Sequence, residues 1–184
     1  MRERRTPQPL DESKLNELAL RYVGRFATSR AKLVAYLKRK IRERGWSGER
    51  TADAAAMAER FAALGYIDDA GFALARSRAL TGRGYGKRRV SEALRSAGID
   101  ETDGEAARDH ADAEAVASAL RFAERRKIGP FGTKPVTDPK ERQRLLAAMI
   151  RAGHGFAIAR AIVALGPGSP VEPEALAERD RSLA

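Results

Sequence analysis

Residues able to contact a charged partner are concentrated in a loop at positions 82–89, which reads GRGYGKRR. Its glycines let a backbone approach a partner closely, and its cations suit phosphates or carboxylates. The pattern differs from a P-loop, because no lysine followed by serine or threonine ends it and no strand precedes it. The candidates for partner contact are Arg83, Tyr85, Lys87, Arg88 and Arg89. The alternative is a plain connection between helices, with the tyrosine packed inward and the cations in water.

A second group of cations lies on the outer face of a helix predicted over residues 30–44. Such a face suits DNA phosphates or an acidic protein surface, although an ordinary solvated helix face has the same composition. The residues assigned to contact with DNA or a partner are Arg30, Lys38, Arg39 and Arg42.

The remaining polar residues predict no catalysis and no metal or cofactor site. Asp68 and Asp69 are adjacent, and we expect one to cap a helix while the other faces solvent or an arginine. His110 and His154 lack partners at metal-ligand spacing, and Trp46 is expected to pack behind Gly45. The sequence therefore supports a binding protein, not an enzyme.

Composition favours a helical protein with an anionic partner. The chain has 184 residues and a net charge of +10 at pH 7, so a polyanion or an acidic protein is expected to bind it. A genome rich in G and C, which favours arginine and alanine codons, would produce the same bias. There is no cysteine, no signal peptide and no apolar run of membrane length, so we expect a cytoplasmic protein that does not enter membranes.

Apolar residues at helical spacing, with capping residues and glycine stops, predict an all-α fold. A basic mobile arm (1–12) and a disordered tail (167–184) are expected to flank the helices. The predicted helices span residues 13–27, 30–44, 50–64, 69–80, 101–110 (short and weak), 112–126, 140–152 and 155–165. Val90 and Leu94 predict a further helix that ends at Gly98. A loop is expected at residues 128–139.

Three helix ends repeat one pattern of two apolar residues a turn apart, a glycine and a further residue. The three sets are Leu37, Ile41, Gly45 and Trp46; Val90, Leu94, Gly98 and Ile99; and Leu145, Met149, Gly153 and His154. They predict three tandem three-helix repeats, at residues 13–66, 67–110 and 111–166. Such small units stabilise one another by stacking, so an elongated, curved array is expected.

The central stretch of the chain resembles the RecX family, bacterial regulators of the RecA recombinase. The similarity rests on Gly65-Tyr66-Ile67-Asp68-Asp69, Phe72-Ala73, Gly84-Tyr85-Gly86, Arg89-Val90, Leu94 and Gly98-Ile99. It extends more weakly over residues 15–165. The chain departs from the family in its third repeat, where His154 and Gly155 separate Gly153 from Phe156, and in a loop unusually rich in glycine and proline.

This resemblance implies a monomeric regulator of DNA repair, homologous recombination and the SOS response. Its partner would be the RecA–DNA filament, with DNA contacted through the filament and also directly, and its effect mostly inhibition of recombinase and ATPase activity. The alternative is a direct nucleic-acid-binding regulator that uses a helix pair as a helix-turn-helix, which would show sequence preference. A helical scaffold for another protein stays open as well.

Overall fold

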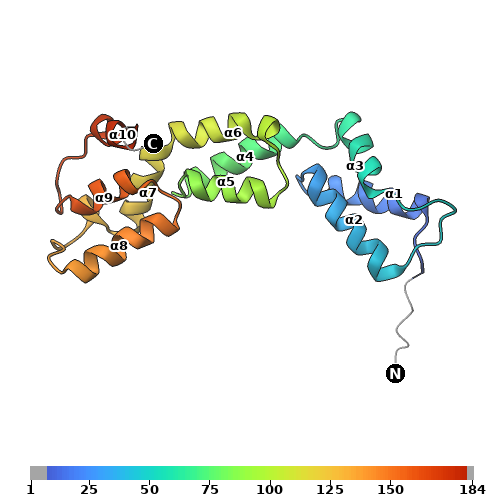
Figure 1. Cartoon of the computed structure of the whole chain (residues 1–184), viewed down its shortest axis with the longest axis horizontal. Helices are drawn as coiled ribbons and strands as arrows, with labels where there is room; N and C mark the ends of the chain where they lie inside the picture. The colour runs from blue at the N-terminus through green and yellow to red at the C-terminus, as the bar shows by residue number, and fades with distance from the viewer. Residues whose placement is uncertain (1–7, 182–184) are drawn as a thin grey trace, which may run out of the picture. The chain divides into compact units, whose positions relative to one another are not determined.

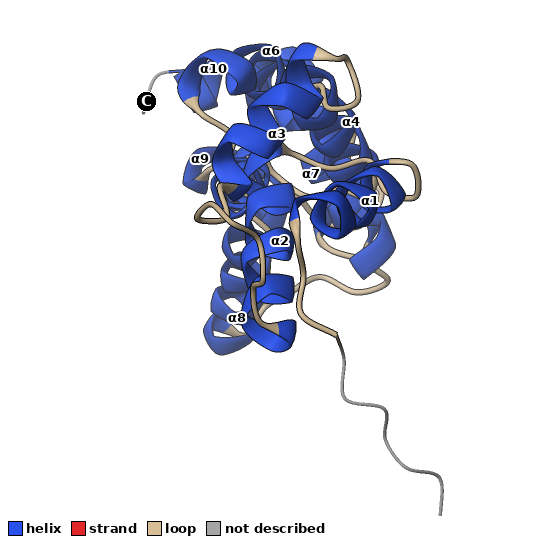
Figure 2. Cartoon of the chain, turned by 90° about the vertical axis from the view of Figure 1, so that its right-hand side faces the viewer, coloured by secondary structure: helices blue, strands red, loops and turns tan. Residues whose placement is uncertain are grey.

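The computed structural model describes residues 8–181, and nearly all of its regular structure is helical (Figures 1 and 2). The helices are α1 (Glu12–Val23), α2 (Arg30–Arg44), α3 (Ala54–Ala63), α4 (Asp69–Gly82), α5 (Lys87–Ser96), α6 (Glu101–Ala113), α7 (Ala115–Arg126), η1 (Gly129–Phe131, a 3₁₀ turn), α8 (Pro139–Arg151), α9 (Phe156–Ala164) and α10 (Pro173–Arg181). The predicted all-α class is confirmed. Within residues 8–181, no helix is both long and apolar enough to span a bilayer.

Contacts between residues divide the chain into two units. Unit 1 contains the residues up to Phe72 together with Ala97–Ile99, and unit 2 contains Ala73–Ser96 and the residues from Asp100 onward. The boundary thus falls within α4. The division into three repeats, and the curved array that it implies, stay predictions.

Unit 1 is built around the apolar faces of α1, α2 and α3, where Leu15, Leu33, Leu37 and Phe61 are buried. Leu10 joins this core with no exposed surface, and its backbone pairs with the segment after α2. Its N–H donates to Gly45 O at 3.0 Å, and its carbonyl accepts from Ser47 N at 2.8 Å.

Leu10 therefore corrects the predicted mobile arm of residues 1–12. Residues 1–7 lie outside the described part of the chain. Residues 8–12 are ordered, because burying Leu10 removes a leucine side chain from water and its two backbone bonds fix the segment.

The main core of unit 2 lies among α7, α8, α9 and α10, around Phe122, Met149, Ile158 and Ile162. Leu176 of α10 belongs to this core with 5% of its surface exposed. The prediction of a disordered tail is thus wrong for residues 173–181. This buried leucine, together with Val171 packed against the same core, supplies the apolar contact that the sequence pattern did not reveal.

Short polar side chains start the helices as expected, by accepting bonds from free backbone amides of the first turn. Ser29 accepts from Lys32 N at 3.2 Å, and Asp100 accepts from Asp103 N at 2.7 Å. Asp68 caps α4 by accepting from Gly71 N at 2.8 Å. Asp69 faces Arg30, so the predicted division of roles between the two aspartates is confirmed.

Several helices differ from their predicted bounds, and α1 ends at Val23 instead of residue 27. α3 begins at Ala54, because the Asp53 carboxylate accepts from Ala55 N and Ala56 N and so caps the helix there. α6 is a regular helix of 13 residues, not a short weak one. Small residues let it pack closely in unit 2, and Ser77 Oγ donates to Ala107 O at 2.7 Å. α7 consequently begins at Ala115, after the end of α6.

The three repeated helix ends each contain a glycine with a positive φ. Gly45, Gly98 and Gly153 have φ values of 82°, 68° and 97°, a region that residues with a Cβ seldom adopt. Ile99 and His154, which follow two of these glycines, are buried. The common spacing in the sequence thus corresponds to a common requirement for glycine.

Candidate functional site

The basic loop with its glycines connects α4 to α5 and is held by other parts of unit 2. Gly86 N donates to Ala152 O at 3.0 Å, and Arg88 N donates to Gly153 O at 3.2 Å. The Arg125 guanidinium donates to Arg83 O, and Arg121 Nη1 donates to Thr81 O at 3.3 Å. The loop is therefore fastened to α7 and to the turn between α8 and α9.

Two of its glycines, Gly84 and Gly86, serve these internal contacts, whereas a Cβ at Gly82 would meet nothing within 4 Å. A Cβ at Gly86 would lie 2.3 Å from Gly153 O, and one at Gly84 would lie 2.9 Å from Phe122 N. The interpretation that these glycines admit a partner's backbone is therefore wrong, because the backbone that approaches them is the chain's own. Tyr85 likewise packs against the core of unit 2.

His154 completes the contact between the two turns. Its ring is buried beside Phe122, with the ring centroids 5.4 Å apart, and its Nε2 donates to Gly84 O at 3.2 Å. Burial lowers the pKa of His154 to about 4, and the bond to the Gly84 carbonyl opposes this shift only in part. A neutral imidazole therefore joins the loop to the turn at neutral pH.

The cations of the loop remain at the surface while its backbone is held. Arg83 lies 5.7 Å above the Tyr85 ring centroid, Lys87 Nζ is 3.2 Å from Asp112 Oδ1, and Arg89 Nη1 is 2.6 Å from Glu92 Oε2. Arg88 is exposed, and its guanidinium has no hydrogen bond or ion pair to the described residues. These cations are only partly neutralised by the chain itself.

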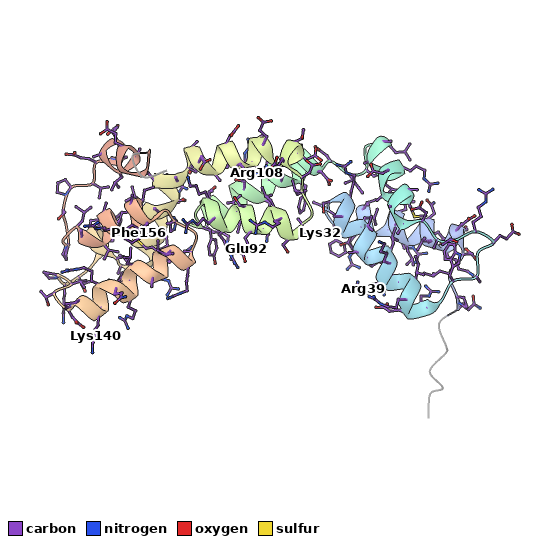
Figure 3. The ribbon with its side chains drawn as sticks, in the orientation of Figure 1. Lys32, Arg39, Glu92, Arg108, Lys140 and Phe156 are labelled. Carbon is purple, nitrogen blue, oxygen red and sulfur yellow. The ribbon has the colours of Figure 1, made fainter. Side chains whose placement is uncertain are left out.

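Two of these cations line a hollow between α5 and α6 that sequence reasoning missed. The hollow has a volume of about 540 Å³, and its polar lining consists of Lys87, Arg88, Ser91, Glu92, Arg95, Arg108 and Asp112. Figure 3 shows Glu92 on α5 and Arg108 on α6. Arg108 is held in place by bonds of 3.0 Å to the carbonyls of Asp100 and Glu101.

One signal for this surface was present in the sequence. Arg88, Ser91 and Arg95 are spaced three and then four residues apart, which places them on one side of a helix. The contribution of Arg108 depends on the packing of α6 against α5, and no local pattern indicates it. The structure thus groups Lys87 and Arg88 with these residues, whereas Arg83, Tyr85 and Arg89 do not line the hollow.

The cations of α2 belong to unit 1. Lys38 and Arg42 are exposed without ion pairs to the described residues, and Arg39 Nε lies 3.6 Å from Glu43 Oε1. Lys32 lies over the Phe72 ring, with Nζ 4.8 Å from its centroid. Figure 3 shows Lys32 and Arg39 along this helix. They form an exposed basic face.

Arg30 differs from its neighbours because it is held by two carboxylates. Its Nε lies 2.8 Å from Oδ2 of the buried Asp69, and its Nη1 lies 3.2 Å from Glu59 Oε2. The hydrogen bond to Asp69, followed by the one to Glu59, raises the pKa of Arg30 above its ordinary value. The residue thus joins the start of α2 to α4, and its role in partner contact stays a prediction.

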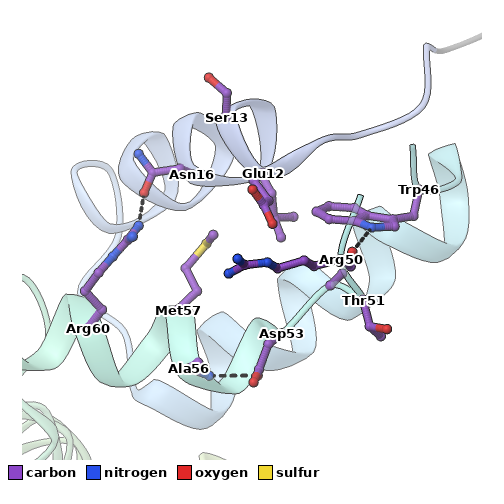
Figure 4. Close-up of a pocket in the computed structure, with 12 residues that line it drawn as sticks. Glu12, Ser13, Asn16, Trp46, Arg50, Thr51, Asp53, Ala56, Met57 and Arg60 are labelled. Carbon is purple, nitrogen blue, oxygen red and sulfur yellow. Dashed lines mark hydrogen bonds between the residues drawn. The ribbon is translucent and has the colours of Figure 1, made fainter. Parts of the chain in front are cut away.

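A second hollow, of about 630 Å³, lies in unit 1 (Figure 4). Trp46 Nε1 donates to Arg50 O at 2.7 Å, Arg60 donates to Asn16 Oδ1, and Asp53 caps α3. These four side chains are bonded to the protein itself, and we assign the hollow no function.

No protein-family model matches the chain. It is 28% identical over 168 residues to the regulatory protein RecX of Myxococcus xanthus (strain DK1622), an alignment covering 88% of this chain and 90% of that protein. The chain is therefore similar to a RecX regulatory protein along most of its length. It also matches the fold of the crystal structure of RecX from Lactobacillus salivarius, with a TM-score of 0.58 and 17% identity, over 82% of this chain and 93% of the other. The predicted resemblance to the RecX family is confirmed.

Proposed function

We propose that the protein binds the RecA recombinase filament on DNA and lowers its ATPase and strand-exchange activities. The observation that carries this proposal is the similarity to a RecX regulatory protein along 88% of the chain. In this role the protein acts as a monomer in the cytoplasm, in DNA repair, homologous recombination and the SOS response. It acts by occupation of the filament, without catalysis of its own.

The exposed cations supply the contact that this function requires. The basic face of α2 and the hollow between α5 and α6 place Lys38, Arg42, Arg88 and Arg95 at the surface without ion pairs to the described residues. Cations that are not neutralised internally can displace the counterions of phosphates or pair with carboxylates of the recombinase. Occupying the filament groove would hinder subunit rearrangement and access of a second strand.

The test is the DNA-dependent ATPase rate of the same organism's recombinase, titrated with this protein at fixed salt and excess DNA. We expect inhibition at amounts well below one molecule per recombinase subunit, because one bound molecule affects many subunits of a filament. No inhibition, together with sequence-selective binding to bare DNA, would replace the proposal with the helix-turn-helix alternative.

A variant with Arg83, Lys87, Arg88 and Arg89 changed to alanine tests the contact surface. We expect the concentration for half-maximal inhibition to rise at least about tenfold, since several charge-assisted contacts are lost at once. A control with Arg21, Arg25 and Arg50 changed to alanine removes exposed cations of unit 1 outside α2, and it should inhibit nearly as the unaltered protein does. Unchanged inhibition by a folded quadruple variant would contradict the role of the loop.

A further inference from the structure

An open hollow of about 680 Å³ lies in unit 2 between α8, α9 and the segment before α8. Its walls include the apolar side chains of Val136, Leu146, Phe156 and Val163. Figure 3 shows Phe156 at the beginning of α9 and Lys140 at the beginning of α8. The volume falls within the range of roughly 300–1,000 Å³ that is typical of ligand-binding sites.

The exposed side chain of Phe156 indicates that this hollow contacts a partner. Its side chain is 52% exposed, although the adjoining residues of α9 are buried in the core of unit 2. An exposed phenylalanine beside a hollow lined by leucine and valine leaves apolar surface in water, which a partner can cover. Aromatic residues of this kind are enriched in the centres of protein interfaces.

The charge of the hollow selects the partner. Arg142 and Arg160 line it, and no aspartate or glutamate does. Arg142 Nη2 donates to Val136 O at 3.0 Å, so its guanidinium is held at the wall. Arg160 is exposed, and its side chain has no hydrogen bond or ion pair to the described residues. An occupant with carboxylates and apolar side chains would match both features.

We propose that this hollow binds an acidic segment of the recombinase that carries leucine-like or aromatic side chains. The inference rests on the proposed function for the identity of the partner, and it adds a protein-binding site to the basic surfaces described above. The walls are mainly aliphatic and hold one aromatic side chain, Phe156, so they fit peptide side chains better than a run of stacked bases.

This hollow is built where the chain departs from the pattern of its family. Val136 belongs to the loop rich in glycine and proline, and Phe156 follows the inserted His154 and Gly155. The site is therefore a property of this chain, and the family resemblance did not predict it.

The decisive experiment places a photo-reactive benzoylphenylalanine at position 156 or at position 88 of the full chain. Each protein is irradiated with the same organism's recombinase assembled on single-stranded DNA. We expect position 156 to cross-link to the recombinase, within a peptide rich in aspartate or glutamate and apolar residues. Cross-linking from position 88 reports binding to the filament independently of the hollow.

Two outcomes overturn the inference in distinguishable ways. If position 88 cross-links while position 156 reacts only with DNA or with nothing, the filament is bound and the hollow is not its protein contact. If neither position cross-links under conditions in which the protein is folded, the proposed function fails as well.

Substitutions give a second, independent measurement of the same site. Phe156→Ala and Arg160→Glu should each weaken binding to the filament about tenfold, as expected for central aromatic and arginine contacts. Phe26→Ala is the matched control, because Phe26 is also 52% exposed but lies in unit 1. Equal binding by Phe156→Ala, Arg160→Glu and Phe26→Ala would overturn the inference.

Discussion

At the scale of single residues, His154 holds a structural contact that forms only while its imidazole is neutral. Its ring lies in the core of unit 2 and donates to a carbonyl of the basic loop, 70 positions away in the sequence. A histidine in this position is neutral by necessity, because protonation would bury a charge with only one hydrogen bond. The contact between loop and turn therefore depends on the unprotonated ring.

Because the folded protein needs a neutral His154 ring, we expect its free energy of unfolding to fall in mild acid. Burial lowers the pKa of His154 to about 4, whereas the unfolded chain titrates near 6.5. Between these values the unfolded state binds more protons, so the stabilisation is complete above about pH 6.5 and is lost as the pH falls toward about 4. The loss should reach about 3 kcal/mol, and His154→Gln should lack it.

The measurement is urea-induced unfolding of both proteins at several pH values across this interval. Because the carboxylates are common to the two proteins, the difference between their pH profiles isolates His154. Parallel profiles would show that the ring is accessible to protons in the folded state.

At the scale of elements, the turn between α4 and α5 and the turn between α8 and α9 fit together through their backbones. A methyl group at Gly86 would lie 2.3 Å from Gly153 O, which is backbone and cannot move aside cheaply. Gly82 stands four residues earlier in the same region, and a Cβ there would meet nothing within 4 Å.

Gly86→Ala should therefore destabilise the protein by about 1–3 kcal/mol, the usual range for overpacking. Gly82→Ala should be neutral or slightly stabilising, because it replaces glycine within α4. Thermal unfolding followed by circular dichroism compares the pair. Equal melting temperatures of the two variants would mean that the turns separate readily.

The helices themselves were largely predictable from the sequence. The segments against which they and their loops pack were not. Periodic apolar residues and glycine stops predicted helix α2 with its observed bounds, and three helix ends that each have a glycine of positive φ. The order of residues 8–12, by contrast, depends on pairing between Leu10 and Trp46, which are far apart in the sequence. Likewise, the loop glycines looked suited to a partner because the sequence does not show that Gly153 packs on Gly86.

At the scale of the whole molecule, the net charge of +10 is a property of many separate cations. Several candidate contacts are already paired internally, among them Arg30 with Asp69 and Arg89 with Glu92. Only the cations that stay accessible can release counterions from a bound polyanion, so the formal charge overstates the number of phosphate contacts.

Binding to the recombinase filament should therefore weaken as the salt concentration rises, and only a few cations should determine how steeply the affinity falls. In a plot of the logarithm of affinity against the logarithm of salt concentration, each phosphate contact adds about 0.7–0.9 to the slope. Changing Arg88 and Arg95 to alanine should lower the slope by roughly two such contributions. Fluorescence anisotropy across a series of potassium chloride concentrations gives both slopes, and identical slopes would exclude the hollow between α5 and α6 as a phosphate site.

The fit between Gly86 and Gly153 also constrains how this protein can diverge. Neither position tolerates a side chain while the other turn keeps its path, since Gly153 has a φ of 97° and its Cβ would lie 2.5 Å from Arg89 N. Descendants of this sequence must therefore inherit both glycines or remodel both turns in concert. The two positions are 67 residues apart in the sequence, and we expect them to change only together during evolution.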